Sequence, residues 1–410
     1  MTNRMNRNRL NIGTYHLRPE ARDEDHIREL AECGIDFVIS VNYDRPALDL
    51  FEKYSLGAIV NGIVPGWWGG DGDNAGKLEQ LNPLDTYCKA AEGFTDHPAI
   101  WAIDIGDEPS ALDFPYYGRV FDTVKRLFPK QFPYLNLYPN YASVAVNNAS
   151  ETVNQLGTAT YGEHIDAYCR NVPADYVCYD FYVYSSSIDK AYDNLKTVAD
   201  AARRTGRDMW IVLQVNAHVP DYWVTGNMLR FQAFSAMAFG VNVITWACYA
   251  GGWWTNQVLD AANNKTVQYA RLQKVNREIR SIAGLYMDYE VRGTHFVGFS
   301  DRSELPATIT PLEALSTGFV KNLRPAGDGK LIVGDMIARG HCGGRYLFVF
   351  SADDYRDLHP RANEITFGTA GSGSFTVKGP QGLIPLRRTG DGGYSFTLMS
   401  NECAMIVCND

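Results

Sequence analysis

The sequence lacks most of the short motifs by which enzyme classes are recognised. It contains no Cys-x-x-Cys pair, no His-x-His or His-x-x-x-His pair, and no Gly-x-Ser-x-Gly turn. A zinc site, a paired-histidine metal site and the serine nucleophile of α/β-hydrolases are therefore not indicated. The eight cysteines are scattered through apolar segments, which predicts buried thiols rather than a disulfide framework. We predict neither a metal ion nor a cofactor.

Strong charge and long apolar runs are also missing. The formal net charge is -9, whereas a nucleic-acid partner would require a concentrated basic face. No segment is apolar enough to cross a bilayer, so we expect neither nucleic acid nor a membrane as partner. Residues 1–9 are polar and basic and do not form a signal peptide. The location stays open between the cytoplasm and secretion after removal of a leader.

The first two thirds of the chain alternate short apolar runs with amphipathic stretches. This is the pattern of parallel strands connected by helices, and eight of each predict an α/β fold, a (β/α)₈ TIM barrel over residues 1–289. A doubly wound open sheet would need a glycine-rich phosphate turn after its first strand, where only Gly13 is found. The expected strands are 10–17, 37–43, 58–65, 100–106, 134–138, 176–184, 209–216 and 241–249. The expected helices are 23–32, 46–54, 84–94, 116–127, 161–170, 188–204, 228–239 and 266–282.

The pattern changes beyond Tyr289. Residues 290–410 carry short alternating runs separated by Gly, Asp and Pro, which predicts an antiparallel β-sandwich domain. Its turns show no cluster of aromatic residues, so we interpret it as a support for the barrel, with independent carbohydrate binding as the alternative.

The fourth expected strand carries the strongest chemical signal. It ends in Asp107, Glu108 and Pro109, and a barrel holds its chemistry at the carboxyl ends of its strands. Alternation along the strand would place Asp104 and Glu108 on one face, where two close carboxyl groups raise the pKa of one of them. Glu108 is therefore the candidate general acid. Asp104 is either its neighbour in the site or a structural acid.

The other strand ends are rich in hydroxyl, amide and aromatic side chains. Such groups hydrogen-bond a polyhydroxylated ligand and stack on its faces, so we predict a carbohydrate substrate. Each Trp pair, 67–68 and 253–254, either stacks on sugar or packs in the core. The candidate binding residues are Tyr15, His16, Asn42, Trp67, Trp68, Asp107, Asn136, Tyr138, Tyr182, Gln214, Asn216, Trp246, Trp253 and Trp254.

Cleavage of a glycosidic bond requires a second carboxylate. Asp180 interrupts an otherwise apolar and aromatic strand, where a charge is costly without a purpose or a partner. It is our candidate for the second catalytic residue, and the alternative is an acid that orients another side chain. Asp44 and Glu163 are weaker candidates, since Glu163 fits the first turn of a helix.

A barrel with Asp107-Glu108-Pro109 after strand four, the aromatic end of strand eight at Trp246, and a following β-sandwich resembles the clan A glycoside hydrolases. The resemblance implies that Glu108 is the acid/base, with Asp107 in place of the usual Asn. It also implies a nucleophilic Glu at the end of strand seven, where this sequence has Gln214. Either Asp180 or a loop carboxylate supplies the partner, or the barrel binds glycan without cleaving it. A lyase or isomerase that uses tyrosines is a third hypothesis.

Overall fold

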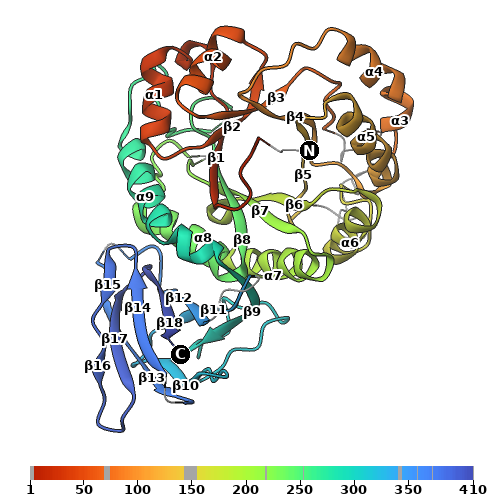
Figure 1. Cartoon of the computed structure of the whole chain (residues 1–410). Coiled ribbons are helices and arrows are strands. Elements are labelled where there is room, and N and C mark those ends of the chain that lie inside the picture. The colour runs from red at the N-terminus through yellow and green to blue at the C-terminus, as the bar shows by residue number, and fades with distance from the viewer. Residues whose placement is uncertain are drawn as a thin grey trace.

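A computed structural model of the chain describes residues 4–409, apart from 69–73, 143–154, 218, 253, 340–343, 358 and 372. Eight parallel strands form one sheet that curves into a ring, and helices surround it (Figure 1). The strands lie in the order β5-β4-β3-β2-β1-β8-β7-β6. They are β1 (Asn11–Tyr15), β2 (Phe37–Asn42), β3 (Gly57–Asn61), β4 (Ile100–Asp107), β5 (Phe132–Asn136), β6 (Tyr176–Phe181), β7 (Asp208–Gln214) and β8 (Val241–Ala247).

The eight predicted helices are observed and α3 is an additional one, and the amino ends of two helices show why they begin where they do. The Asp23 side chain accepts a hydrogen bond from the His26 amide, and Thr160 and Glu163 form a reciprocal capping box. Glu163 is thus a structural acid at a helix start. The α-helices of the barrel are α1 (Glu24–Glu32), α2 (Arg45–Lys53), α3 (Leu78–Leu81), α4 (Leu84–Glu92), α5 (Phe114–Leu127), α6 (Tyr161–Asn171), α7 (Ile188–Thr205), α8 (Gly226–Phe239) and α9 (Val267–Met287).

The ring closes weakly between β5 and β6. A single parallel bridge, Leu137 with Tyr179, joins the two along the described residues, in contrast to the ladders elsewhere. Tyr176 fills the seam with its side chain: its hydroxyl donates to the Pro133 carbonyl at 2.9 Å and accepts from the Leu135 amide at 3.0 Å. A side chain therefore replaces part of the missing backbone ladder.

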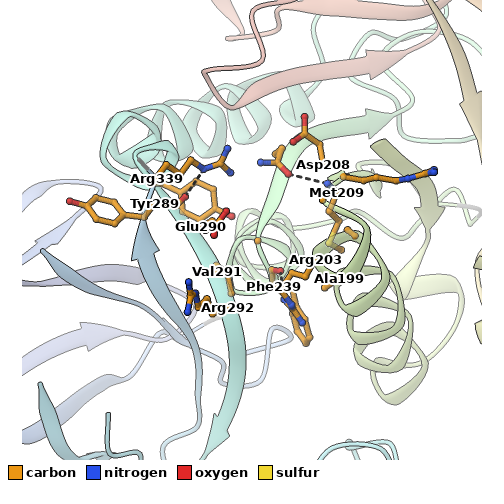
Figure 2. A pocket seen from close by; sticks show the side chains of 16 residues that line it. Ala199, Arg203, Asp208, Met209, Phe239, Tyr289, Glu290, Val291, Arg292 and Arg339 are labelled. Atoms are coloured by element: carbon orange, nitrogen blue, oxygen red, sulfur yellow. Dashed lines mark hydrogen bonds between the residues drawn. The ribbon is translucent and has the colours of Figure 1, made fainter. Parts of the chain in front are cut away.

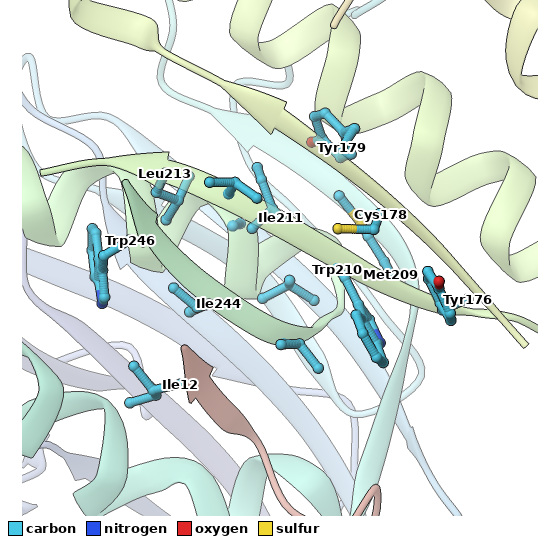
Figure 3. Close-up of a cluster of buried hydrophobic side chains, with 14 of the residues drawn as sticks. Ile12, Tyr176, Cys178, Tyr179, Met209, Trp210, Ile211, Leu213, Ile244 and Trp246 are labelled. Atoms are coloured by element: carbon cyan, nitrogen blue, oxygen red, sulfur yellow. The ribbon is translucent and has the colours of Figure 1, made fainter. Parts of the chain in front are cut away.

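Aromatic and aliphatic side chains fill the core around the strands. Figure 3 shows part of it, where Tyr176 on β6 and Trp210 on β7 stack with ring centroids 4.2 Å apart. Trp246 on β8 is fully buried, and its indole donates to Asn276 Oδ1 on α9 at 2.9 Å. Trp246 therefore joins strand to helix.

Arginines near the start of the chain close the amino end of the barrel. Arg4 pairs with Asp96 ahead of β4 at 2.8 Å. Arg7 pairs with Asp208 at the start of β7, and Arg9 with Asp36 ahead of β2. The arginines of residues 4–9 therefore neutralise aspartates at the amino end of the barrel.

The remaining strands form a β-sandwich that packs on the barrel beside α8 (Figure 1). One sheet has the order β10-β13-β17-β16 and the other β15-β14-β18-β12-β11-β9. The strands are β9 (Tyr289–Val297), β10 (Val320–Pro325), β11 (Leu331–Ala338), β12 (Arg345–Ser351), β13 (Ala362–Thr369), β14 (Ser374–Gly379), β15 (Gly382–Ile384), β16 (Arg387–Arg388), β17 (Tyr394–Met399) and β18 (Cys403–Asn409). The predicted architecture, a TIM barrel followed by an antiparallel β-sandwich, is confirmed.

The six-stranded sheet shares a hydrophobic core with the barrel. Ile332 and Phe348 belong to the same buried cluster as the barrel strands, while a second cluster lies between the two sheets. The division at residue 289/290 therefore stays a prediction, even though α9 ends at Met287 and β9 begins at Tyr289. No helix among the described residues is long and apolar enough to cross a membrane.

Candidate active site

A cavity of about 460 Å³ opens at the carboxyl ends of the barrel strands. Four carboxyl groups and several polar or aromatic side chains reach it from β1, β2, β4, β5, β6 and β8. Its lining consists of Tyr15, His16, Ser40, Trp68, Asp104, Gly106, Asp107, Glu108, Asn136, Asp180, Tyr182, Ala247 and Cys248. None of these described lining residues is a Lys or an Arg.

An unusual backbone at the end of β4 brings two consecutive acids to this cavity. Gly106 has φ 157°, and a Cβ there would meet the Tyr117 hydroxyl at 2.3 Å and the Trp67 carbonyl at 2.6 Å. Glu108 has φ 44°, in the left-handed region, which costs a non-glycine residue about 1–2 kcal/mol. Its amide donates to the Asn136 carbonyl at 2.9 Å. Asp107 and Glu108 therefore both line the cavity, which simple strand alternation would not allow.

Burial raises the pKa of all four acids, and repulsion from neighbouring acids adds to it for Asp104, Glu108 and Asp180. Desolvation raises the pKa of Asp104 to about 8, with repulsion from Asp107 adding to it. Desolvation is also the main cause of the raised pKa values of Asp107 and Asp180. For Glu108, desolvation and the charges of Asp180 and Asp107 raise the pKa well above the usual range. The neighbours that act on Glu108 are thus Asp180 and Asp107 rather than Asp104.

Glu108 and Asp180 form a close pair. The charge of Asp180 raises the pKa of Glu108, while the interaction with Glu108 lowers that of Asp180, so the proton is favoured on Glu108 and the charge on Asp180. Asp180 is 3% exposed, and in the described structure its Oδ2 receives no hydrogen bond of regular geometry. When two carboxyl groups share one site, the pKa of one of them is raised, so one group keeps its proton to a higher pH.

Two neighbours fix these carboxyl groups. The Trp68 indole donates to Glu108 Oε2 at 2.9 Å and is itself 53% exposed, so its ring is open to a ligand. The Asn136 amide donates to Asp180 Oδ1 at 2.8 Å and to Asp107 Oδ1 at 3.1 Å. Hydrogen bonds from Asn136 lower the pKa of both Asp side chains, against the stronger effect of burial.

The cavity contains nine of the residues selected from the sequence. The adjacent tryptophans separate, because Trp67 packs against the core while Trp68 faces the cavity. The nine are Tyr15, His16, Trp68, Asp107, Glu108, Asn136, Asp180, Tyr182 and, as the possible neighbour of Glu108, Asp104.

Asn42 is replaced in the cavity by Ser40. The pairing of β2 with β3 shifts register between Ile39 and Val41, and Ser40 at that irregularity has φ 64°. This bulge turns Ser40 into the cavity and leaves Asn42 exposed. A bulge at a polar residue inside an apolar run has no clear sequence signal. Asp44, two residues on, caps α2.

Three further candidates do not line the cavity: two hydrogen-bond to the backbone and one packs in the core. Gln214 accepts from the Tyr184 amide at 3.0 Å and donates to the Asn216 carbonyl at 3.0 Å. Asn216 is fully buried and accepts from the Cys248 amide. Trp246 lies in the core, as described above. The prediction that these side chains face the ligand-binding end is therefore corrected.

The remaining candidates lie beside the cavity or outside the described residues. Tyr138 is buried, and Trp254 packs edge-on against Tyr182 with ring centroids 4.8 Å apart. Trp254 thus supports a cavity residue and lines a separate depression. Trp253 lies outside the described residues.

One cluster of potential metal ligands occurs among the described residues, and its hydrogen bonds oppose coordination. It consists of Asp49, Glu52 and the buried His97. His97 Nδ1 accepts from the Ala99 amide at 3.1 Å, so Nε2 carries the proton and donates to Asp49 Oδ1 at 3.0 Å. The ring therefore offers no free lone pair toward the acids.

A second cavity, of about 390 Å³, lies at the amino end of β7 and β8 against the sandwich (Figure 2). Arg203 and Arg339 are prominent in its wall. They donate to the backbone carbonyls of Phe239 and Tyr289, the first of which ends α8. These arginines complete helix and strand ends, and the cavity holds no acid–base pair comparable with Glu108 and Asp180 among its described residues.

The comparisons with known proteins agree on architecture. No protein-family model and no curated protein matches this sequence. A cycloisomaltooligosaccharide glucanotransferase from Paenibacillus sp., solved with cycloisomaltoheptaose, is 8% identical; the match covers 98% of this chain and 85% of that chain with a TM-score of 0.58. A structure described as a glycoside hydrolase is 10% identical, with coverage of 98% and 93% and a TM-score of 0.54. At these identities the likeness shows a shared fold over nearly the whole chain.

Proposed function

We propose that this protein is a glycoside hydrolase that cleaves a glycosidic bond by carboxylate acid/base chemistry. The observation that carries the proposal is the interacting pair Glu108 and Asp180, held in one cavity at the carboxyl end of a TIM barrel. Two carboxyl groups whose surroundings separate their proton affinities are what this reaction requires.

The electrostatics support a division of roles between the two acids. Glu108 retains its proton to a higher pH, so it would protonate the leaving oxygen as general acid. Asp180 carries the charge and would act as the second carboxylate. Trp68 would hold Glu108 in place, and its exposed indole face would stack on a sugar ring.

The closeness of the pair favours retention of configuration. Retaining enzymes hold their carboxyl groups about 5–5.5 Å apart, whereas inverting enzymes need about 6.5–9.5 Å to admit a water molecule. The charge of Asp180 raises the pKa of Glu108, and both carboxyl groups line the same cavity, which supports the shorter separation. Asp180 would therefore attack the anomeric carbon, and Glu108 would then activate the water that releases the product.

The charge of the cavity restricts the substrate. With four carboxyl groups and no Lys or Arg among its described lining residues, the cavity offers no cationic side chain to the anionic group of a phosphorylated sugar or a uronic acid. We therefore propose a neutral or basic sugar at the cleaved residue.

The test is a product screen with wild-type protein and the Glu108→Gln variant on a broad panel of neutral, basic and acidic glycosides and oligosaccharides. Proton NMR of the first-formed anomer would determine stereochemistry. We expect hydrolysis of a neutral or basic substrate with retention, and a loss of about 10²–10⁴-fold in kcat/KM in the variant. Glu79→Gln, on the exposed surface of α3, is the control and should keep wild-type activity.

Sugar binding without turnover by wild-type protein would instead support the silent glycan-binding barrel. The observation behind that alternative is Gln214, which stands at the end of β7 in place of an acid and whose side chain is hydrogen-bonded to the backbone. Unsaturated or rearranged products would indicate a lyase or an isomerase.

A further inference from the structure

The side-chain amide of Asn136 is the central link between the acids of the cavity. Its two hydrogens are both used, one by Asp107 and one by Asp180. Its backbone carbonyl accepts from the Glu108 amide. Asn136 thus touches three of the four acids, and the orientation of its side chain decides whether Asp107 and Asp180 face donors or an oxygen.

The oxygen of this amide meets a thiol. Cys178 on β6 is 2% exposed, and its Sγ donates to Asn136 Oδ1 at 3.4 Å. Burial raises the pKa of the Cys178 thiol, so its hydrogen is retained. If the amide were reversed, its oxygen would face two carboxylates and its nitrogen would face a donor.

The hydrogen bonds continue away from Cys178 in one direction. Since the thiol hydrogen goes to Asn136, Cys178 accepts from the Tyr134 hydroxyl, at 3.5 Å. The hydrogen of Tyr134 is then used, so its oxygen accepts from Tyr15, at 2.8 Å. Tyr15 lines the cavity and is left with lone pairs for a ligand. Each link uses the one hydrogen available, which fixes the direction of the whole chain.

We propose that Tyr15, Tyr134 and Cys178 form a one-way hydrogen-bond chain that fixes the Asn136 amide and thereby positions Asp107 and Asp180. Cys178 is a positioning residue, because it acts through Asn136 rather than by contact with substrate. The predicted effect on turnover rests on the proposed glycosidase function, whereas the effect on the carboxyl groups does not.

The proposal predicts a change in protonation when the chain is broken. Asn136 hydrogen bonds lower the pKa of Asp107 and Asp180, so a freely rotating amide would let both pKa values rise. The other titratable groups facing these acids stay in place. They are Asp104 on β4, Glu108 just after it, Tyr15 and His16 at the end of β1, Tyr141 after β5, Tyr161 at the start of α6 and Tyr182 after β6. A rise in the pKa of Asp180 moves the acid side of the activity profile to higher pH.

The experiment compares Cys178→Val, Cys178→Ser and the control Cys403→Val, a fully buried thiol on a strand of the sandwich. The first readout is the pH dependence of kcat/KM. The second, independent of activity, is titration of aspartate carboxyl carbons by ¹³C NMR, with assignment through Asp107→Asn and Asp180→Asn. We expect Cys178→Val to raise both carboxyl pKa values and the acid limb by about half a pH unit or more.

Cys178→Ser should restore the wild-type values, because serine supplies the donor, and Cys403→Val should not change them. The proposal would be overturned if Asp107 and Asp180 had the same pKa values in wild type and in Cys178→Val. It would also be overturned if Cys178→Ser shifted these pKa values as much as Cys178→Val does. If Cys178→Val does not fold, Tyr134→Phe breaks the chain one link earlier and should give a smaller shift in the same direction; no shift there would also overturn it. Shifted titrations in a protein without turnover would support the positioning chain and refute the proposed hydrolase.

Discussion

The two ends of the barrel hold the same kind of residue in opposite electrostatic states. At the amino end, Asp36 meets Arg9 and Arg280, and Asp96 meets Arg4 and Lys130. At the carboxyl end, the four cavity acids meet one another, an amide and an indole. Position in the ring therefore decides whether a carboxylate serves the fold or is available for chemistry.

The pKa shifts run in opposite directions. Burial acts to raise the pKa of Asp96, but hydrogen bonds from Arg4, Lys130 and Gln131 lower it well below the usual range. Burial raises the pKa of Asp104 to about 8, because no cation opposes it. The amino end gains stability from its charges, whereas the carboxyl end gives up stability to keep its acids close together.

Among acids at the carboxyl end, Asp180→Asn is expected to show the largest difference between its effect on activity and its effect on stability. Loss of the carboxylate that we propose as the second catalytic group should reduce kcat/KM by at least about 10³-fold. The thermal midpoint should stay level or rise, since a buried repulsive charge is removed. Steady-state kinetics and calorimetry of the same preparation measure both quantities; a large fall in the midpoint would show that Asp180 is a structural acid.

Asp36→Asn should show the reverse behaviour. Asp36 is 7% exposed, accepts from the Ile12 amide at 2.8 Å and pairs with two arginines, so its loss should cost about 3–5 kcal/mol of unfolding free energy. Activity well below the unfolding temperature should be unchanged. Urea unfolding measures the loss, with exposed Asp122→Asn on α5 as a control expected within about 0.5 kcal/mol of wild type. If Asp36→Asn and Asp122→Asn lost similar free energies of unfolding, the paired Asp36 would contribute no more to stability than an exposed acid.

Asp104→Asn should separate the two ends of the barrel further, because its effect on the free energy of unfolding should depend on pH. In the folded state Asp104 holds a proton up to about pH 8, whereas the unfolded chain releases it near pH 4. Wild-type stability therefore falls across this interval, and the variant should be more stable by about 2–3 kcal/mol at pH 8 after allowance for screening. Calorimetry at pH 5 and pH 8 tests this, and a constant difference between the two proteins would contradict it.

The smallest expected effect is that of Arg7→Gln. Arg7 and Asp208 are both partly exposed, so the pair should contribute about 1 kcal/mol and lose value at high salt. Urea unfolding of wild type and variant at low and high sodium chloride measures it. A loss above 3 kcal/mol would mean that this end of the barrel depends on single ion pairs.

Periodicity predicted the fold well because the barrel repeats one unit. Each of the eight strands was predicted within a few residues, and each expected helix was observed. The acids Glu108 and Asp180 were found because a charge at the end of an apolar strand is costly without a purpose.

The sequence was less informative about where individual side chains point. The bulge at Ser40 and the left-handed Glu108 change the direction of neighbouring side chains, and neither has a local signature. Gln214 and Trp246 were assigned to the site by strand position, but one binds backbone and the other packs on α9. The chain from Tyr15 to Asn136 crosses three strands, so spacing along the sequence could not reveal it.

The seam between β5 and β6 gives ligand binding a mechanical consequence. Asn136 belongs to one side of the seam and Asp180 to the other, and their hydrogen bond reinforces the single backbone bridge nearby. Glu108 lies on the β5 side of the seam and Asp180 on the β6 side. A sugar bound to both would therefore connect the two strands that share the fewest backbone hydrogen bonds among the described residues of the ring. Binding of the sugar would then make local opening of the barrel between β5 and β6 less frequent. The rate of amide hydrogen exchange near this seam would therefore measure both ligand binding and local stability.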